Sequence, residues 1–132
     1  MTADISYSVD DRDLTGREFF DLATRVWPGE YAISGVELAL ERTINITARA
    51  GDRLIGSVRV LTDGYFFGTI PELLVDPDYQ GRGVGRRLME LAWEASPTSL
   101  YFGAQAGKEE FYENLGFEHG LQSFFKRKPR DA

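Results

Sequence analysis

The sequence predicts an α/β fold in which a mixed, mostly antiparallel central sheet carries helices on both faces. Two kinds of periodicity predict it. Segments that alternate apolar and polar residues lie between short turns in the middle of the chain, and segments with apolar residues three or four apart flank them. The expected order is β-α-α-β-β-β-α-β-α-β. The 132 residues suffice for one domain spanning 1–132.

The first part of the chain predicts one strand and two helices. Residues 5–9 alternate between apolar and polar side chains, which is typical of a strand. Thr15 and Glu18 have the spacing of a capping box, and the helix that they open ends at a Pro-Gly pair. Ser34 and Glu37 repeat this signature, so we expect a second, shorter helix there.

Three consecutive strands are predicted next. Residues 43–50 and 54–61 alternate and are separated by a Gly-Asp turn. Residues 65–75 read as a third, long strand that contains Pro71. Because proline cannot donate a ladder hydrogen bond, its position predicts a bulge or a sheet edge. Strands joined by such short turns pair antiparallel.

The last third of the chain alternates between the two element types. Apolar residues recur at helical spacing over 83–95, and a short strand follows at 99–102. Residues 107–114 predict a short helix that ends at a Leu-Gly pair, and 121–128 predict a final strand. A strand, helix and strand in this order indicate a crossover connection.

The composition excludes several classes of function. Lys and Arg number 15 against 21 Asp and Glu, a formal charge of −6, so neither nucleic acid nor an anionic membrane is an expected partner. Cysteine is absent and His119 is the single histidine, which argues against thiol chemistry and against a metal site. The chain has neither an apolar stretch long enough to span a membrane nor a signal-peptide pattern at its first residues. We therefore expect a cytoplasmic protein.

One run of residues is far more specific than the rest. The apolar strand that ends at Val75 leads into Asp76-Pro77, then into three glycines in alternate positions, and then into a helix. Such a junction leaves backbone N–H groups free at the positive end of a helix, where a phosphate can bind. A Walker loop requires Gly-Lys-Ser/Thr, but Gly85 is followed by two arginines. A dinucleotide fold requires Gly-x-Gly-x-x-Gly, and here the third glycine comes one position early.

A third phosphate-binding pattern fits. Residues 80–85, Gln-Gly-Arg-Gly-Val-Gly, match Gln/Arg-x-x-Gly-x-Gly/Ala after a strand that ends in Val-Asp-Pro. Residues 111–117 match Phe/Leu-Tyr-x-x-x-Gly-Phe at the expected distance downstream. Together these two motifs resemble the GNAT superfamily of N-acetyltransferases, and the resemblance extends from about residue 43 to residue 117.

The resemblance implies acetyl-CoA as co-substrate and assigns residues to it. The family holds the cofactor pyrophosphate on backbone amides of the glycine loop, and the pantetheine arm pairs with the strand before it. Gln105 stands where the family often has an asparagine that touches the cofactor. The implied cofactor-binding residues are Leu73, Leu74, Val75, Gln80, Gly81, Arg82, Gly83, Val84, Gly85, Arg86, Gln105 and Tyr112.

The implied reaction is direct attack of a primary amine, on a small molecule or a peptide, on the acetyl thioester. Tyr112 matches the family tyrosine that protonates the leaving thiolate, and Glu72 is the candidate base, directly or through water. A backbone N–H at Leu74 or Val75 would stabilise the oxyanion. A non-catalytic acyl-CoA-binding module is the alternative, and because family members often dimerise, a homodimer is also suggested. The aromatic residues Trp27, Tyr31, Phe66 and Phe67 are candidates for the acceptor pocket or for the core.

Overall fold

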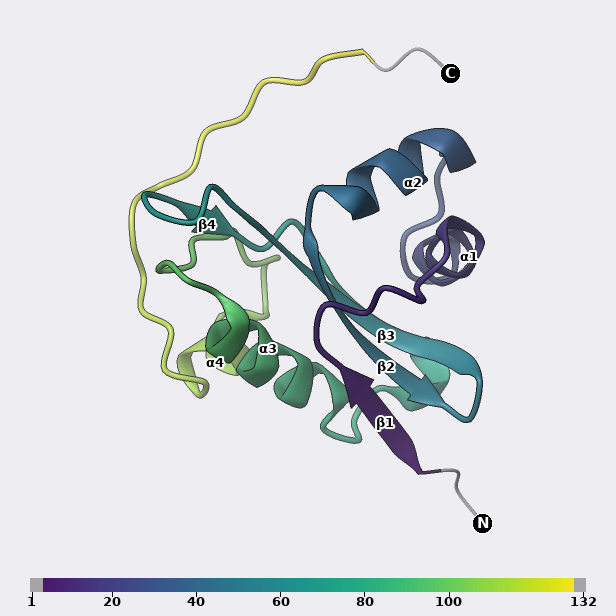
Figure 1. The fold of residues 1–132 in the computed structure, drawn as a ribbon. Helices are drawn as coiled ribbons and strands as arrows, with labels where there is room; N and C mark the ends of the chain where they lie inside the picture. Colours follow the sequence, from purple (N-terminus) through teal and green to yellow (C-terminus); the bar gives the residue numbers. More distant parts are fainter. Residues whose placement is uncertain (1–3, 130–132) are drawn as a thin grey trace.

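A computed structural model describes residues 4–129 as one twisted sheet between two helical layers (Figure 1). The sheet order is β1-β2-β3-β4, and β5 also pairs with β3; all of these strand pairs are antiparallel. The strands are β1 (Ile5–Ser8), β2 (Ile44–Ala50), β3 (Arg53–Thr62), β4 (Gly68–Thr69) and β5 (Leu73–Val75). The predicted α/β class, with helices on both faces, is confirmed. A single domain over 1–132 stays a prediction that extends beyond the described residues at both ends.

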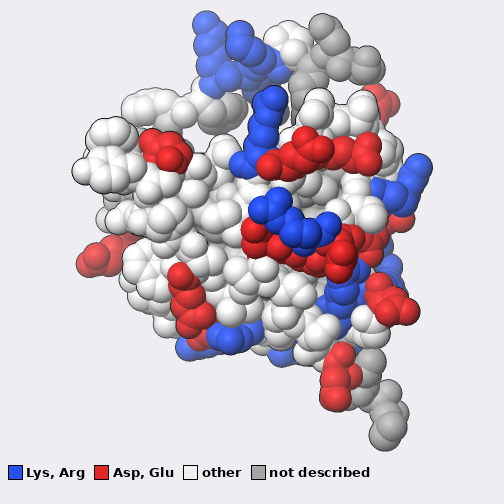
Figure 2. Space-filling view, in the orientation of Figure 1, with Lys and Arg blue, Asp and Glu red and all other residues white. Residues whose placement is uncertain are grey.

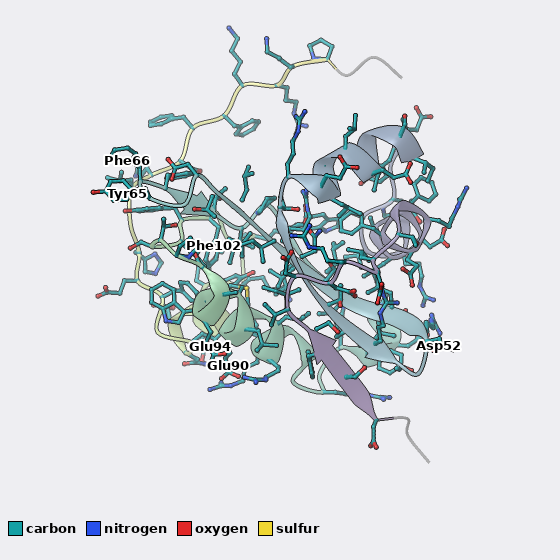
Figure 3. All side chains as sticks on the ribbon, in the orientation of Figure 1. Asp52, Tyr65, Phe66, Glu90, Glu94 and Phe102 are labelled. Carbon is teal, nitrogen blue, oxygen red and sulfur yellow. The ribbon has the colours of Figure 1, made fainter. Side chains whose placement is uncertain are left out.

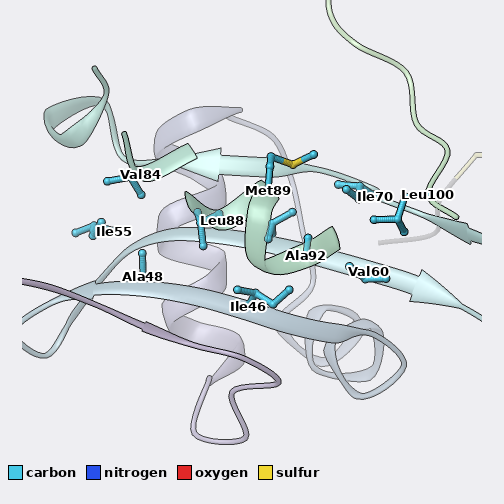
Figure 4. Packing of buried hydrophobic residues seen from close by; sticks show 11 residues of the cluster. Ile46, Ala48, Ile55, Val60, Ile70, Val84, Leu88, Met89, Ala92 and Leu100 are labelled. Carbon is cyan, nitrogen blue, oxygen red and sulfur yellow. The ribbon is translucent and has the colours of Figure 1, made fainter. Parts of the chain in front are cut away.

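Helix α3 (Val84–Ala95) covers one face of the β2–β3 hairpin and buries the main core there. Leu88 and Ala92 are fully buried against Ile46 and Val60, which alternation places on this face of the strands (Figure 4). Gly56 permits the close approach of the helix, since a Cβ there would lie 3.0 Å from Leu88 and 3.1 Å from Val84. Burying one such leucine contributes about 1.5–3 kcal/mol.

Helices α1 (Gly16–Val26) and α2 (Ile33–Glu41) cover the opposite face. The predicted capping box of α1 is confirmed, because the Glu18 N–H donates to Thr15 Oγ1 at 3.1 Å and the Thr15 N–H donates to Glu18 Oε2 at 3.0 Å. The predicted cap at Ser34 is wrong. Helix α2 begins earlier, after Ala32, so Ser34 lies inside it, and the Glu37 side chain packs against Gly16 of α1 instead.

The face below α1 and α2 is unusually polar for a sheet interior. Arg49 donates to Glu18 at 2.5 Å and to Asp11 at 3.2 Å, and the hydrogen bond from Arg49 is the main cause that lowers the pKa of Glu18. Acidic and basic side chains interleave over this side of the molecule, whereas the surface around β4 is mainly uncharged (Figure 2). In this view basic side chains gather along the C-terminal segment at the top, and elsewhere they alternate with acidic ones.

The predicted long strand over 65–75 is wrong as a single element, because two short strands replace it. The Asp63 Oδ1 atom accepts three backbone N–H groups, from residues 65, 66 and 67, and holds them in a turn. Residues 70–72 leave β3, since Pro71 has no N–H and the Ile70 N–H donates to the Tyr101 carbonyl at 3.3 Å. Only Leu73–Val75 return to pair with β3.

The last two predicted strands are also absent from the described chain. Residues 99–102 form only an isolated parallel bridge between Thr69 and Tyr101, because β4 is too short to extend the ladder. Residues 121–128 run past β4 toward α2 without pairing, and Leu121, Phe124 and Phe125 are 82–93% exposed (Figure 1). β-forming residues alone do not make a strand without a partner edge. The predicted helices over 83–95 and 107–114 are present as α3 and α4 (Glu109–Glu113).

Candidate functional site

The glycine loop connects β5 to α3 through a single 3-10 turn, η1 (Pro77–Tyr79). Gly81 and Gly83 adopt left-handed backbone conformations with φ of +78° and +81°. A Cβ on either residue would meet nothing within 4 Å, so the backbone conformation, and not lack of space, requires glycine here. Gly83 is the N-cap of α3, so the N-terminus of that helix faces the loop.

Six consecutive backbone N–H groups of this loop are unused. Arg87 is the first to donate within α3, to the Gly83 carbonyl at 3.1 Å, and no acceptor within residues 4–129 is recorded for the N–H groups of residues 81–86. Unsatisfied N–H groups at a helix start carry a positive partial charge. The loop is therefore a preformed cradle for an anion of diphosphate size.

Three arginines surround this cradle, and the structure leaves their guanidinium groups weakly held. Arg82 lies over the Tyr79 ring, 5.1 Å from its centroid. Arg86 and Arg87 each lie 3.6 Å from Glu90, which stands on the outer side of α3 (Figure 3). Exposed pairs of this kind stabilise by at most about 1 kcal/mol. These side chains can therefore turn toward a phosphate at little cost.

The outer edge of β5 is free to pair with an extended ligand. The Asp76 N–H donates to the Ile55 carbonyl at 2.8 Å, so by antiparallel alternation Leu74 also directs its backbone groups toward β3. Leu73 and Val75 then direct theirs outward, where Gln80 Nε2 already donates to the Val75 carbonyl at 3.1 Å. The Val75 N–H is thus available, whereas the Leu74 N–H belongs to the sheet.

Glu72 precedes β5 and is held by an arginine. Arg59 of β3 binds its carboxylate through two hydrogen bonds, at 2.5 Å and 2.6 Å, and both side chains are 13–15% exposed. The Arg59 guanidinium also lies 5.6 Å from the centre of the Phe19 ring of α1. A carboxylate has about four lone-pair sites, so two remain for another donor. Sequence reasoning missed Arg59, although a single charged residue within an apolar strand was the available signal.

Tyr112 lies in α4, next to the start of α3. The ring of its neighbour Phe111 packs on Gly85, where a Cβ atom would lie 3.6 Å from the ring. Helix α4 therefore packs against the junction of β5 and α3. The Tyr112 ring is packed edge-on against Phe102 and Phe117, with centroids 4.8 Å and 6.4 Å away. Burial raises the pKa of the Tyr112 phenol, and its hydroxyl has no hydrogen bond to any residue between 4 and 129. This phenol is a protonated donor without a protein acceptor.

The sequence of residues 41–119, more than half of the chain, matches the family model described as the acetyltransferase (GNAT) domain. The chain belongs to this family. It is 39% identical over 82 residues to GCN5-related N-acetyltransferase 2, chloroplastic, of Arabidopsis thaliana; the match covers 55% of this chain and 31% of the relative. This chain thus spans about a third of the length of that curated relative.

Solved GNAT structures share the fold over nearly the whole chain. An acetyltransferase of the GNAT family from Streptococcus pneumoniae superposes with a TM-score of 0.74 at 22% identity, over 95% of this chain and 100% of the other. The aminoglycoside N-acetyltransferase AAC(6')-Iy, solved in complex with CoA, superposes with a TM-score of 0.71 at 16% identity, over 97% of each chain. At these identities the likeness concerns the fold alone.

The predicted residues differ in whether they line one surface hollow of this GNAT domain. Gln105 is exposed, and it does not line the surface hollow that Tyr112 lines. Phe66 and Phe67 do line that hollow, together with Phe102, whereas Trp27 and Tyr31 do not. The lining of this hollow includes Arg87 but none of residues 80–86. The predicted acceptor aromatics are therefore divided between two places.

No group of three His, Cys, Asp or Glu side chains among residues 4–129 is placed to hold a metal ion. None of the helices in that range has the length and hydropathy needed to cross a bilayer. The cytoplasmic location stays a prediction, and the Arabidopsis relative carries the word chloroplastic in its name.

Proposed function

We propose that this chain is an acetyl-CoA-dependent N-acetyltransferase that acts on a primary amine of a small molecule or peptide. The observation that carries the proposal is the series of free N–H groups over residues 81–86, placed by two left-handed glycines at the start of α3. Its donor chemistry fits a diphosphate, and the family match favours that of CoA. Acetyl-CoA supplies an activated acetyl thioester.

The chain would bind this co-substrate at two places. The backbone amides from Gln80 to Arg86 hold the diphosphate, and the arginine side chains of residues 82 and 86 add charge. The outer edge of β5 pairs with the pantetheine arm in the manner of an added strand. Leu74 contributes a side chain that is 1% exposed and so fixes the strand in the core. The Val75 N–H is the proposed oxyanion donor.

The reaction needs two proton transfers. The neutral amine attacks the thioester carbonyl, the carbon–sulfur bond breaks, and the products are an amide and free CoA. Glu72 accepts the amine proton through its remaining lone pairs, directly or by one water, while Arg59 holds it in place. Tyr112 donates the proton that the leaving thiolate requires. Direct attack is favoured because the chain has no cysteine to carry an acyl group.

The role of Glu72 predicts a loss of turnover when its carboxylate is replaced by an amide. Glu72→Gln keeps the size of the side chain and a carbonyl that Arg59 can reach, but removes the basic oxygen. We expect kcat/KM for the amine to fall by about 100-fold. Glu94→Gln, at an exposed carboxylate on the outer side of α3, is the control and is expected to behave as wild type (Figure 3). Wild-type kcat/KM in Glu72→Gln would remove Glu72 as the base.

A screen for free CoA tests the proposed function as a whole. The full chain with acetyl-CoA is offered simple amines, amino acids, polyamines and short peptides, and release of free thiol is followed. Thiol release with at least one amine, together with the acetylated product by mass spectrometry, is the expected result. Tight binding of acetyl-CoA without transfer to any class would favour the non-catalytic acyl-CoA-binding module. Absence of binding would refute both functions.

A further inference from the structure

A buried carboxylate stands at the entrance to the glycine loop. Asp76, the residue between β5 and η1, is 1% exposed, and its Oδ1 atom accepts the Asp78 N–H at 2.9 Å. Two guanidinium groups complete its partners: Arg25 Nη2 lies 3.0 Å from Oδ1 and Arg53 Nη2 lies 2.9 Å from Oδ2. A buried carboxylate with these donors is fixed in place, because losing one partner leaves charge uncompensated.

The two arginines differ in what they connect. Arg53 is the first residue of β3 and reaches only Asp76, although the backbones of β3 and β5 are already paired. Arg25 lies in the last turn of α1, and the same nitrogen that binds Asp76 is also 3.3 Å from Asp78 Oδ2. Arg25 thus bridges two residues of the first turn of the loop. It connects that turn to α1, which lies on the face of the sheet opposite α3.

The path of the glycine loop depends on the position of Asp76. The Tyr79 N–H donates to the Asp76 carbonyl at 2.8 Å, and the Tyr79 ring supports Arg82. Beyond Tyr79 come the two left-handed glycines and the free N–H groups, which have no further hydrogen bonds to the body of the domain. A shift at Asp76 would therefore move the amides of residues 81–83, which lie between Tyr79 and the buried Val84.

We propose that Arg25 and Asp76 are positioning residues, which hold the glycine loop in its ligand-binding position and tie it to α1. This inference rests on the proposed function. Arg25 acts through Asp76 and Asp78 and touches no reacting atom, so its loss should affect acetyl-CoA binding and leave the chemical step intact.

Arg25→Met tests the proposal, since it keeps most of the apolar stem and removes the charge. We expect the acetyl-CoA Kd by calorimetry, and the KM for acetyl-CoA, to rise between about 10-fold and 100-fold with kcat nearly unchanged. Arg25→Lys should restore part of the affinity. Arg17→Met is the matched control, because Arg17 lies on the same helix and forms an exposed pair with Asp21 at 3.9 Å. It is expected to bind as wild type.

Amide hydrogen exchange without ligand gives an independent readout. The N–H groups of Asp76, Asp78 and Tyr79 are all hydrogen-bonded, so they should exchange at least about tenfold faster in Arg25→Met and unchanged in Arg17→Met. Wild-type affinity and exchange in Arg25→Met would overturn the inference. If the wild type binds no acetyl-CoA, the proposed function fails, while exchange still decides whether Arg25 holds the loop.

Discussion

Gly83→Glu is expected to lower acetyl-CoA affinity by at least about 100-fold, or about 2.7 kcal/mol. Gly83 has a φ of +81°, where a residue with a Cβ costs about 1–2 kcal/mol, so the variant loop would relax away from its observed course. The new carboxylate also projects from the N-cap of α3 beside the proposed diphosphate position. Calorimetric titration with acetyl-CoA measures the change.

Two companion variants separate backbone strain from charge. Gly83→Ala imposes the strain without the carboxylate and should lose less affinity. Gly51→Glu changes a glycine of the β2–β3 turn that has a φ of +61° and equally open surroundings, so it should cost similar stability and leave affinity unchanged. If the Kd of Gly83→Glu for acetyl-CoA is within threefold of the wild-type Kd, the cradle is not where the diphosphate binds.

Tyr112→Phe is expected to lower kcat by about 10²–10⁴-fold, the usual contribution of a general acid. Phenylalanine keeps the packing against Phe102 and Phe117, so the acetyl-CoA Kd should change little. Burial raises the pKa of the Tyr112 phenol above its ordinary value of about 10, so the wild type should keep its proton donor from neutral pH to beyond that value. Steady-state kinetics across pH, with single-turnover measurements, test this expectation.

Tyr101→Phe is the control for Tyr112→Phe. Tyr101 lines the same hollow, is 51% exposed and stacks on Phe67, but stands on the segment that bridges to β4. Removal of the Tyr101 hydroxyl should leave kcat unchanged. Wild-type turnover in Tyr112→Phe would mean that the thiolate receives its proton from water or from another residue.

The parts of the fold that the sequence predicts well are those that local chemistry determines. The capping box of Thr15 and Glu18 needs only four neighbouring residues, and the glycine loop needs only backbone conformations that glycine allows. The division of the third strand was not predictable in this way. It depends on the Asp63 turn and on a hydrogen bond from Ile70 to Tyr101, 31 positions later in the sequence.

The same dependence on distant partners limits what the sequence says about the site. Glu72 is recognisable next to its strand, but its partner Arg59 lies 13 residues earlier and meets it only because the chain leaves β3 and returns. The Arg25–Asp76 contact joins residues 51 positions apart. The predicted strand at 121–128 has suitable residues but no partner edge among the described residues, and strand propensity cannot supply one.

An amide NMR titration of the full ¹⁵N-labelled chain with acetyl-CoA tests whether the glycine loop holds the diphosphate. We expect the largest shift changes on the N–H groups of residues 81–86, which acquire an acceptor, followed by Leu73 and Val75 at the outer edge of β5. The turn of Asp63 should change less. Saturable binding whose shift changes avoid the glycine loop, or no shift changes at millimolar acetyl-CoA, would show that this loop does not bind the diphosphate.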